Sequence, residues 1–346
     1  MNWPAPKRIL VVGPAWVGDM VMTQCLLTLL KQRYADALID VLAPAWTLPL
    51  LARMPEVHDA ITAPFTHGEA RVFERLALGK SLRARHYDWA IVLPITWKSA
   101  LVPFGANIPR RTGFLGEARW VLLNDVRSLD KAGLPMMAQR YIALGLDLNE
   151  TLPAPIPQPA LSSSAQQQSA TQARLQLKAD NRPILALCPG AEYGPAKRWP
   201  PKHFADVARS KIEAGWQVWI FGSAKDLPLA AEIAAGLDPT ACVNLAGKTR
   251  LEEAIDLLAL ADAVVTNDSG LMHVAAALSR RVIAIYGSSD PGYTPPLSPN
   301  ATIVSIQTEC SPCFKKECPY GHYKCLQELK PDRVLAELER TAQTTR

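Results

Sequence analysis

Residues 8–43 read RILVVGPAWVGDMVMTQCLLTLLKQRYADALIDVLA, and this stretch decides the fold class. An aliphatic run ends at a glycine, a long segment with apolar residues at helical spacing follows, and a second short β-branched run comes next. The order strand, helix, strand is typical of a parallel sheet covered by helices. A further buried-strand pattern, DWAIVLP, stands at 88–94. The first half of the chain therefore predicts a Rossmann-like α/β domain.

The same alternation begins again after residue 180. Residues 147–180 are rich in Pro, Ser and Gln, a composition that does not pack a core, so we expect a linker that leads into a helix. Five apolar runs follow, interleaved with segments of helical periodicity: PILALCPG (183–190), WQVWIFGS (216–223), ACVNLAG (241–247), DAVVTNDSG (262–270) and RVIAIYG (281–287). We predict two Rossmann-like domains, residues 1–160 and 161–330, with a cleft between them, and a C-terminal helix over 331–346.

Composition excludes several classes of protein. The 346 residues are 49% hydrophobic, enough for a large core, and 37 basic against 32 acidic residues give a net charge of +5. This charge is too small for a dedicated nucleic-acid binder but suits anionic small molecules or an anionic membrane surface. The apolar run after Lys7 and Arg8 is too short for a signal peptide, and no segment reaches about 18 uninterrupted apolar residues. We expect a cytoplasmic protein without a nucleic-acid partner.

The loop GPAWVGDM (13–20) resembles a phosphate-binding loop, but Asp19 stands where that motif has a lysine. An acid in the first turn of a helix is stabilised by the helix dipole and by free N–H groups, which keep it ionised. Such a carboxylate either caps the helix or accepts a proton from a substrate hydroxyl. Asp19 is therefore a candidate general base, and a bound phosphate is the poorest fit because the helix start already carries an anion.

Two loops of the second half place charged residues directly after predicted strands, where α/β proteins bind ligands. In CPGAEYGPAKRWP (188–200), Lys197 and Arg198 follow a glycine-containing turn, as a pyrophosphate site needs; the alternative is a solvated basic loop. In FGSAKD (221–226), Asp226 either binds a ribose diol or caps the next helix.

A third loop, VVTNDSGLMHVAAAL (264–278), has the greatest density of polar groups between an apolar strand and an apolar helix. Ser269 and Gly270 present free N–H groups to an anion, and Asp268 is placed to bind sugar hydroxyls. His273 lies one turn into the helix and points back toward the same end. The alternative is that Asp268 caps the helix and that His273 is a satisfied polar residue.

Together these loops resemble those of the ADP-heptose:lipopolysaccharide heptosyltransferases, type II in particular. The likeness runs over nearly the whole chain and is carried by GPAWVGDM, APAW (43–46), KSALVPF (98–104), RTGF (111–114), PGAEYGPAKRWP (189–200), FGSAKD, TNDSGLMHVAAAL (266–278) and YGSSDP (286–291). The resemblance implies an inverting glycosyltransferase of the GT-B architecture, with parallel sheets facing across a cleft. Its N-terminal domain would bind the acceptor and its C-terminal domain the ADP-sugar.

The resemblance also implies a role for each candidate residue. Asp19 matches the catalytic base, which takes a proton from the acceptor hydroxyl in a single displacement. The donor-binding positions are Lys197, Ser269, Gly270 and His273 at the diphosphate, Asp226 at the ribose, Asp268 at the heptose and Thr249 near the adenine. The implied reaction moves L-glycero-D-manno-heptose from ADP-heptose to the first heptose of the lipopolysaccharide inner core. Heptosyltransferase I or another ADP-heptose-dependent core enzyme is the nearest alternative.

The acceptor implied by the resemblance is an anionic, lipid-linked oligosaccharide on the cytoplasmic face of the inner membrane. Four residues are expected to pair with its phosphates or carboxylates: Lys98, Arg110, Arg111 and Arg119. The segment 69–87 (EARVFERLALGKSLRARHY) either rests on the membrane as a basic amphipathic helix or is an ordinary solvated face over a core stripe. Peripheral contact with the membrane is the expectation.

No cofactor is expected, because the sequence contains no Asp-x-Asp triplet of the kind that holds a divalent ion against a diphosphate. Cys310, Cys313, Cys318 and Cys325 have the spacing C-x2-C-x4-C-x6-C, which leaves a structural zinc open although the second pair lacks the usual gap. A nicotinamide-dependent oxidoreductase is disfavoured, since neither half has a G-x-G-x-x-G turn after its first strand. A nucleotide-binding module without catalysis is a further alternative.

Overall fold

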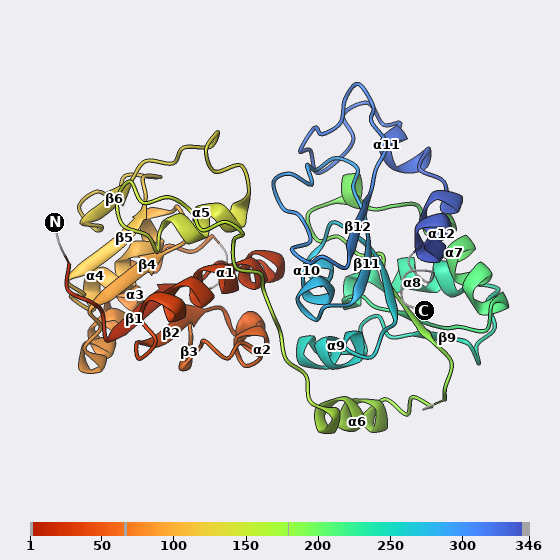
Figure 1. Ribbon diagram of the computed structural model, residues 1–346, viewed down its shortest axis with the longest axis horizontal. Helices are drawn as coiled ribbons and strands as arrows, with labels where there is room; N and C mark the ends of the chain where they lie inside the picture. The colour runs from red at the N-terminus through yellow and green to blue at the C-terminus, as the bar shows by residue number, and fades with distance from the viewer. Residues whose placement is uncertain (1–2, 66–67, 179, 341–346) are drawn as a thin grey trace. The chain divides into compact units, whose positions relative to one another are not determined.

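The computed structural model of the protein describes residues 3–65, 68–178 and 180–340. The chain divides between Pro159 and Ala160 into two compact units. Each unit contains one six-stranded sheet flanked by helices, and all the paired strands described are parallel (Figure 1). The predicted α/β class with two Rossmann-like halves is therefore confirmed.

The sheet of the first unit has the order β3-β2-β1-β4-β5-β6. Its strands are β1 (Arg8–Val12), β2 (Leu38–Ala43), β3 (Asp59–Thr62), β4 (Trp89–Val92), β5 (Arg110–Phe114) and β6 (Asp125–Arg127). Its helical segments are α1 (Val17–Arg33), η1 (Ala45–Thr47), α2 (Leu48–Leu51), α3 (Val72–Leu82), η2 (Arg83–Arg85), η3 (Trp97–Ala100), α4 (Leu101–Gly105) and α5 (Met137–Ala143). The strand order reverses at β1, so the loop after β1 opens at a topological switch point, where such sheets bind ligands.

The sheet of the second unit has the order β12-β11-β10-β7-β8-β9. Its strands are β7 (Ile184–Cys188), β8 (Gln217–Ile220), β9 (Cys242–Asn244), β10 (Ala263–Asn267), β11 (Arg281–Ile285) and β12 (Ala301–Val304). Its helical segments are α6 (Ala165–Arg174), η4 (Pro195–Lys197), α7 (Pro201–Glu213), η5 (Ala224–Asp226), α8 (Leu227–Ala234), α9 (Leu251–Leu258), α10 (Gly270–Ala277), α11 (Lys324–Gln327) and α12 (Pro331–Arg340). The order reverses between β7 and β10, which pair with Val265 opposite Leu187.

Each sheet is covered on both faces, and its central strands are apolar throughout for that reason. In β7, residues 185–188 are buried, and β10 is buried along its whole length. Helix α7 contributes Phe204 and Val207 to the core, and α12 contributes Val334 and Leu338. This rigid framework fixes the positions of the loops that leave the strand ends.

The structure refines two predicted segments. The predicted linker packs against the second unit from Leu161 onward, because the Leu161 N–H donates to the carbonyl of Ala277 (2.9 Å). In α6, the Thr171 hydroxyl donates to Asp256 (3.3 Å). The predicted helix over 331–346 is α12 as far as Arg340, and residues 341–346 lie outside the described residues. Within the described ranges, no helix has the length and apolarity needed to span a membrane.

Candidate active site

The predicted donor-binding residues all follow strands of the second sheet and leave it at one edge. Lys197 ends η4 after β7, Asp226 ends η5 after β8, and Thr249 lies between β9 and α9. Asp268 follows β10 directly and is succeeded by α10. Because the carboxyl ends of parallel strands meet at the same edge, these loops lie in a row in the order of their strands.

The central contact of this row is an ion pair between Lys197 and Asp268. The Lys197 Nζ atom lies 2.5 Å from Asp268 Oδ2, and Asp268 is only 5% exposed. Ser289, which follows β11, donates its hydroxyl to the same carboxylate oxygen at 2.5 Å. The Lys197 ammonium also lies 5.1 Å from the centre of the Tyr193 ring. A lysine, paired with a buried carboxylate, is thus held where β7 and β10 end.

A buried tryptophan fixes the loop that carries this lysine. The backbone N–H of Trp199 donates to Asn267 Oδ1 (3.0 Å), and Asn267 Nδ2 donates to the carbonyl of Pro189 (2.6 Å). The indole Nε1 of Trp199 donates to the carbonyl of Leu329 (2.7 Å). Both ends of the 189–199 loop are therefore tied to the end of β10. Lys197 is positioned by the sheet and not by a flexible loop.

His273 lies in the first turns of α10 and is buried. Burial lowers its pKa to about 4; Asp268 acts to raise it, and Lys197 acts to lower it further. The imidazole is therefore neutral at pH 7 and adds a hydrogen-bonding group without a charge. Ser269 and Gly270 begin the same helix, whose first N–H groups have no intrahelical partner and favour an anion.

Asp226 caps the short turn η5, which leads into α8, and makes no side-chain cap of α8 itself. Its Oδ2 atom accepts bonds from the N–H (2.9 Å) and hydroxyl (2.8 Å) of Ser223, so it caps the turn at η5. Its Oδ1 atom lies 4.0 Å from Arg198 of the neighbouring loop. A Cβ added to Gly190 would lie 2.7 Å from Asp226 Oδ2, so the close approach of these two loops requires a glycine there.

Asp19 lies in the first turn of α1, at the carboxyl end of β1, and is half-buried. The helix begins after Trp16, which supplies no side-chain cap, and the Thr23 hydroxyl donates to the Asp19 carbonyl (2.9 Å). The Trp46 indole donates to the carbonyl of Ala15 (2.8 Å), which ties the GPAW and APAW segments together. Asp19 therefore follows a loop that the Trp46 contact stabilises, where the strand order of the first sheet reverses.

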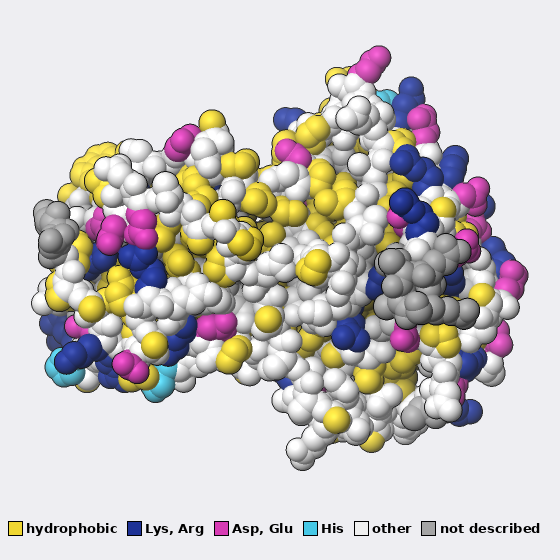
Figure 2. Space-filling model, in the orientation of Figure 1, with side chains coloured by type: hydrophobic (Ala, Val, Ile, Leu, Met, Phe, Trp, Pro, Cys, Tyr) yellow, Lys and Arg dark blue, Asp and Glu magenta, His cyan; other side chains and the backbone are white. Residues whose placement is uncertain are grey.

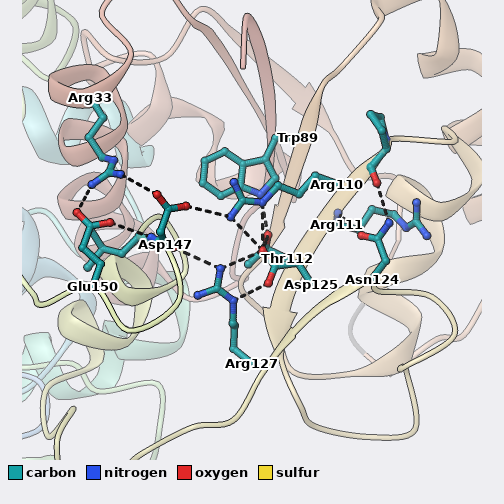
Figure 3. A network of polar contacts seen from close by, with 12 residues as sticks. Arg33, Trp89, Arg110, Arg111, Thr112, Asn124, Asp125, Arg127, Asp147 and Glu150 are labelled. Carbon is teal, nitrogen blue, oxygen red and sulfur yellow. Dashed lines mark hydrogen bonds and ion pairs between the residues drawn. The ribbon is translucent and has the colours of Figure 1, made fainter. Parts of the chain in front are cut away.

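Arg110, predicted to bind the acceptor, is buried and paired inside the first unit. Segment 110–114 is strand β5, and Arg110 is 5% exposed. Its Nη2 atom lies 3.0 Å from Asp125 Oδ2, and its guanidinium stacks 4.0 Å from the Trp89 ring centre (Figure 3). Burial acts to raise the pKa of Asp125, but hydrogen bonds from Arg127 and Thr112 and the charges of both arginines hold it below its ordinary value.

Arg119 and Arg111 are likewise engaged inside the first unit. Arg119 is 1% exposed and donates to the carbonyls of Phe114 (3.1 Å) and Pro94 (2.6 Å), and its burial lowers its pKa to about 10. Arg111 donates to the carbonyls of Leu122 (2.7 Å) and Ile108 (2.5 Å). Lys98 is half-exposed and makes no polar side-chain contact with any described residue. Of the four predicted acceptor residues, Arg110 and Arg119 are buried, Arg111 is half-buried and Lys98 is half-exposed.

Most cations of the 69–87 segment also have partners within the unit. Arg85 pairs with Asp40 (2.9 Å) and Asp59 (2.6 Å), and Arg83 donates to the carbonyl of Gly105 (2.9 Å). Arg75 donates to the carbonyl of Ala70 (2.7 Å) and Arg71 pairs with Glu69 (2.8 Å). This pattern favours the reading of a solvated face whose cations stabilise the fold.

The four cysteines of residues 310–325 are free thiols. Cys310, Cys313, Cys318 and Cys325 are all free, and the described part of the chain holds no group of three His, Cys, Asp or Glu side chains able to bind a metal ion. The structure therefore offers no ligand set for the structural zinc considered from the sequence.

Two residues of the site were not singled out from the sequence. Ser289 touches Asp268, and Asn267 orders the 189–199 loop. Both stand where a strand ends, Asn267 as the last residue of β10 and Ser289 in the YGSSDP segment after β11. Their position after a strand was the signal that could have found them.

Two parallel-sheet α/β units, one bearing a cation, carboxylates and a helix N-terminus along a single sheet edge, define the GT-B-like class of nucleotide-sugar-dependent glycosyltransferases. The family model described as "Glycosyltransferase family 9 (heptosyltransferase)" matches residues 75–324. The chain belongs to glycosyltransferase family 9, the heptosyltransferases.

Similarity extends over nearly the full length of several relatives. The chain is 50% identical over 339 residues to lipopolysaccharide heptosyltransferase 2 of Escherichia coli (strain K12), covering 96% of this chain and 97% of that protein. It is 48% identical over 343 residues to lipooligosaccharide heptosyltransferase 2 of Haemophilus ducreyi, covering 96% and 98%. The solved structure of E. coli ADP-heptose lps heptosyltransferase II superimposes with a TM-score of 0.87 at 48% identity, over 96% of this chain and 98% of that one.

Proposed function

We propose that this chain transfers L-glycero-D-manno-heptose from ADP-heptose to the first heptose of the lipopolysaccharide inner core, with inversion at the anomeric carbon. The observation that carries the proposal is the row of polar groups on the second sheet, centred on the Lys197–Asp268 ion pair. It is supported by near full-length similarity to proteins named lipopolysaccharide heptosyltransferase 2.

The row supplies a partner for each part of the donor. Lys197 and the N-terminus of α10 neutralise the diphosphate, and their effect grows as negative charge develops on the departing ADP. His273 adds a neutral hydrogen-bonding group beside them. Thr249 lies toward the adenine, Asp226 binds the ribose diol with the oxygen that does not cap η5, and Asp268 binds the heptose hydroxyls.

Asp19 acts as the general base. It accepts the proton of an acceptor hydroxyl as that oxygen forms a bond to the anomeric carbon. The bond from the anomeric carbon to the β-phosphate oxygen breaks at the same time, and ADP leaves with the electron pair. A hydroxyl is a weak acid, so the carboxylate helps mainly as the O–H bond breaks, and alignment of the reactants supplies much of the remaining acceleration.

Contact with the inner membrane, at its cytoplasmic face, is also part of the proposal. Two loops of the first unit are joined where the Glu117 N–H donates to the carbonyl of Ile95 (3.3 Å) and Arg119 to that of Pro94 (2.6 Å). These loops expose four apolar side chains: Ile95 (55%), Leu115 (49%), Trp120 (62%) and Val121 (74%). Exposed aromatic and aliphatic side chains of this kind insert into the interface of a bilayer.

Vesicle sedimentation tests the membrane contact. Val121→Ser combined with Trp120→Ala is expected to reduce binding to vesicles of phosphatidylglycerol and phosphatidylethanolamine about tenfold, in line with the apolar area lost. Leu148→Ser removes a side chain that is 70% exposed elsewhere in the same unit and serves as the matched control. Equal loss in both variants, or none in either, overturns the assignment of this surface.

Turnover with defined acceptors tests the reaction itself. Purified protein receives ADP-heptose with inner-core acceptors that carry either no heptose or one heptose. Product is expected only with the acceptor that already carries one. Transfer only to the acceptor without heptose would instead identify heptosyltransferase I, and tight ADP-heptose binding without turnover on either acceptor would favour a binding module.

A further inference from the structure

A pocket of about 390 Å³ lies at the carboxyl ends of β11 and β12, outside the row described above. Tyr286, Ser289 and Asp290 line it from the β11 side, and Ser305, Gln307 and Thr308 line it from the β12 side. Its volume falls within the range of small-ligand pockets. Neither Lys197 nor Asp268 lines this pocket.

The chemistry of the lining suits a polyhydroxy ligand without charge. Asp290 Oδ1 accepts the N–H of Gly292 (2.7 Å), while its Oδ2 makes no hydrogen bond to a described residue. The side chains of Gln307 and Ser305 likewise make none within the described chain. The lining contains no lysine or arginine, which argues against an anion, whereas carboxylate, amide and hydroxyl groups are the usual partners of sugar hydroxyls.

The Tyr286 side chain forms part of the pocket wall and stays protonated. Its hydroxyl donates to the carbonyl of Thr294 (2.6 Å), and burial raises its pKa well above the ordinary value, with Asp268 and Asp290 adding to the effect. Figure 2 shows charged side chains of the second unit gathered over α7 and α12, while the surface in view over β11 and β12 is mostly uncharged. Asp290 is therefore the only group that brings a charge to the pocket.

The pocket is joined to the donor row through one side chain. Ser289 lines the pocket and donates its hydroxyl to Asp268 (2.5 Å). Along the sheet edge the order is β9, β8, β7, β10, β11 and β12, which places Thr249, Asp226, Lys197, Asp268 and then the pocket in sequence. The donor has the same linear order: adenine, ribose, diphosphate, sugar ring and finally the two-carbon arm of the sugar.

We propose that this pocket receives the exocyclic two-carbon diol of the donor heptose and so distinguishes a heptose from a hexose. The inference rests on the proposed function and deepens it, because it assigns the residues that select the sugar. Asp290 Oδ2 accepts a hydrogen bond from one hydroxyl of the arm, and the Gln307 amide binds the other. These residues determine specificity, and the bond-making step remains with Asp19 and the diphosphate-binding groups.

The test compares two donors in wild type and variants. ADP-mannose has the same ring as ADP-heptose but an arm shorter by one carbon and one hydroxyl. Of Asp290→Asn and Gln307→Ala, the variant that loses the contact with the terminal hydroxyl is expected to lower the ratio of kcat/KM for ADP-heptose to that for ADP-mannose about tenfold, because ADP-mannose lacks that hydroxyl. The other variant loses the contact with the hydroxyl that both donors carry, and it is expected to lower kcat/KM for both. Glu309→Gln, which removes an exposed acid outside the pocket lining, is the matched control and should leave both values unchanged.

Every outcome bears on the proposal. An unchanged ratio in both variants overturns it. A rise in the KM of the acceptor with an unchanged donor ratio would show that the pocket holds an acceptor sugar instead, which also overturns it. Gln307 is exposed, so its variant remains informative if Asp290→Asn folds poorly. A wild-type protein that uses neither donor refutes the proposed function and is thereby distinguished from failure of the pocket assignment.

Discussion

Lys197 and Asp268 lie 71 residues apart in the chain, yet the ammonium of one is 2.5 Å from the carboxylate of the other. They meet because β7 and β10 are neighbours in the sheet and because Trp199 ties the lysine loop to the end of β10. A buried carboxylate with one cation and one hydroxyl as partners is sensitive to the loss of either.

Lys197→Ala should reduce kcat/KM for ADP-heptose by roughly 100-fold to 1,000-fold, because the developing charge on ADP loses its fixed cation. Steady-state kinetics with varied donor measures the effect. Lys202→Ala is the control, since its side chain is 81% exposed and pairs with Asp206 on the same helix. A fall no larger than that of the control would remove Lys197 from the diphosphate site.

Asp19→Asn should lower kcat by roughly 100-fold to 10,000-fold while donor affinity stays within a few fold, because the proposed donor-binding groups belong to the other unit. Calorimetric titration with ADP-heptose and rate measurement at saturating substrates separate the two quantities. Asp36→Asn removes an exposed acid after α1 and should leave both unchanged. A loss of donor affinity equal to the loss of rate would contradict this division of labour.

Arg119→Ala should lower the free energy of unfolding by about 2–4 kcal/mol, because three backbone carbonyls lose a buried donor and a cavity remains. Urea unfolding followed by far-UV circular dichroism measures it. Lys98→Ala should change stability by less than about 0.5 kcal/mol but raise the KM for the acceptor. The opposite pattern would restore Arg119 to the acceptor site.

His273 should make the protein less stable as the pH falls. Its pKa is about 4 in the folded protein, against an ordinary value of 6.5, so the unfolded chain binds more protons between these values. The contribution is complete above about pH 6.5 and decreases toward pH 4, by up to about 3 kcal/mol. His273→Asn should lack this component when unfolding free energies at pH 7 and pH 4.5 are compared. Identical pH dependence in variant and wild type would refute it.

Removal of divalent metal should leave the reaction rate unchanged. The expectation comes from the sequence, which lacks an Asp-x-Asp triplet, and from Lys197, which supplies a fixed positive charge. Turnover is measured before and after dialysis against EDTA, with magnesium added back as the control. Loss of activity that magnesium restores would require a metal at the diphosphate.

The sequence predicted the features that depend on local pattern. Apolar runs that end in polar loops located β1, β7, β8 and β10 and hence Asp19, Lys197, Asp226 and Asp268. These predictions succeed because the carboxyl ends of parallel strands converge on one edge whatever the intervening helices do. The loops after β7, β8 and β10 could therefore be assigned to one row of the second sheet, and Asp19 to the end of β1 in the first sheet, without knowledge of any contact.

The partners of Arg110, Arg111 and Arg119 could not be predicted from local sequence pattern. Arg110 and Arg111 sit in a short strand that lacks apolar alternation, and the acid that neutralises Arg110 comes from β6. Arg119 donates hydrogen bonds to backbone carbonyls. Every residue has a backbone carbonyl, so the pattern of side chains does not indicate which ones Arg119 will contact. A basic cluster in a sequence shows how many cations are present, and only tertiary pairing decides which of them remain available.

All the donor groups leave the second sheet at one edge, so the turns at the opposite edge are free of them. Residues 214–216 and 235–241 join α7 to β8 and α8 to β9, and Gly215 and Gly236 stand there with φ of +84° and +72° in open space. A fluorescent label or short peptide tag inserted at these turns would lie at the end of the sheet away from the proposed donor site, where it would not obstruct a bound donor.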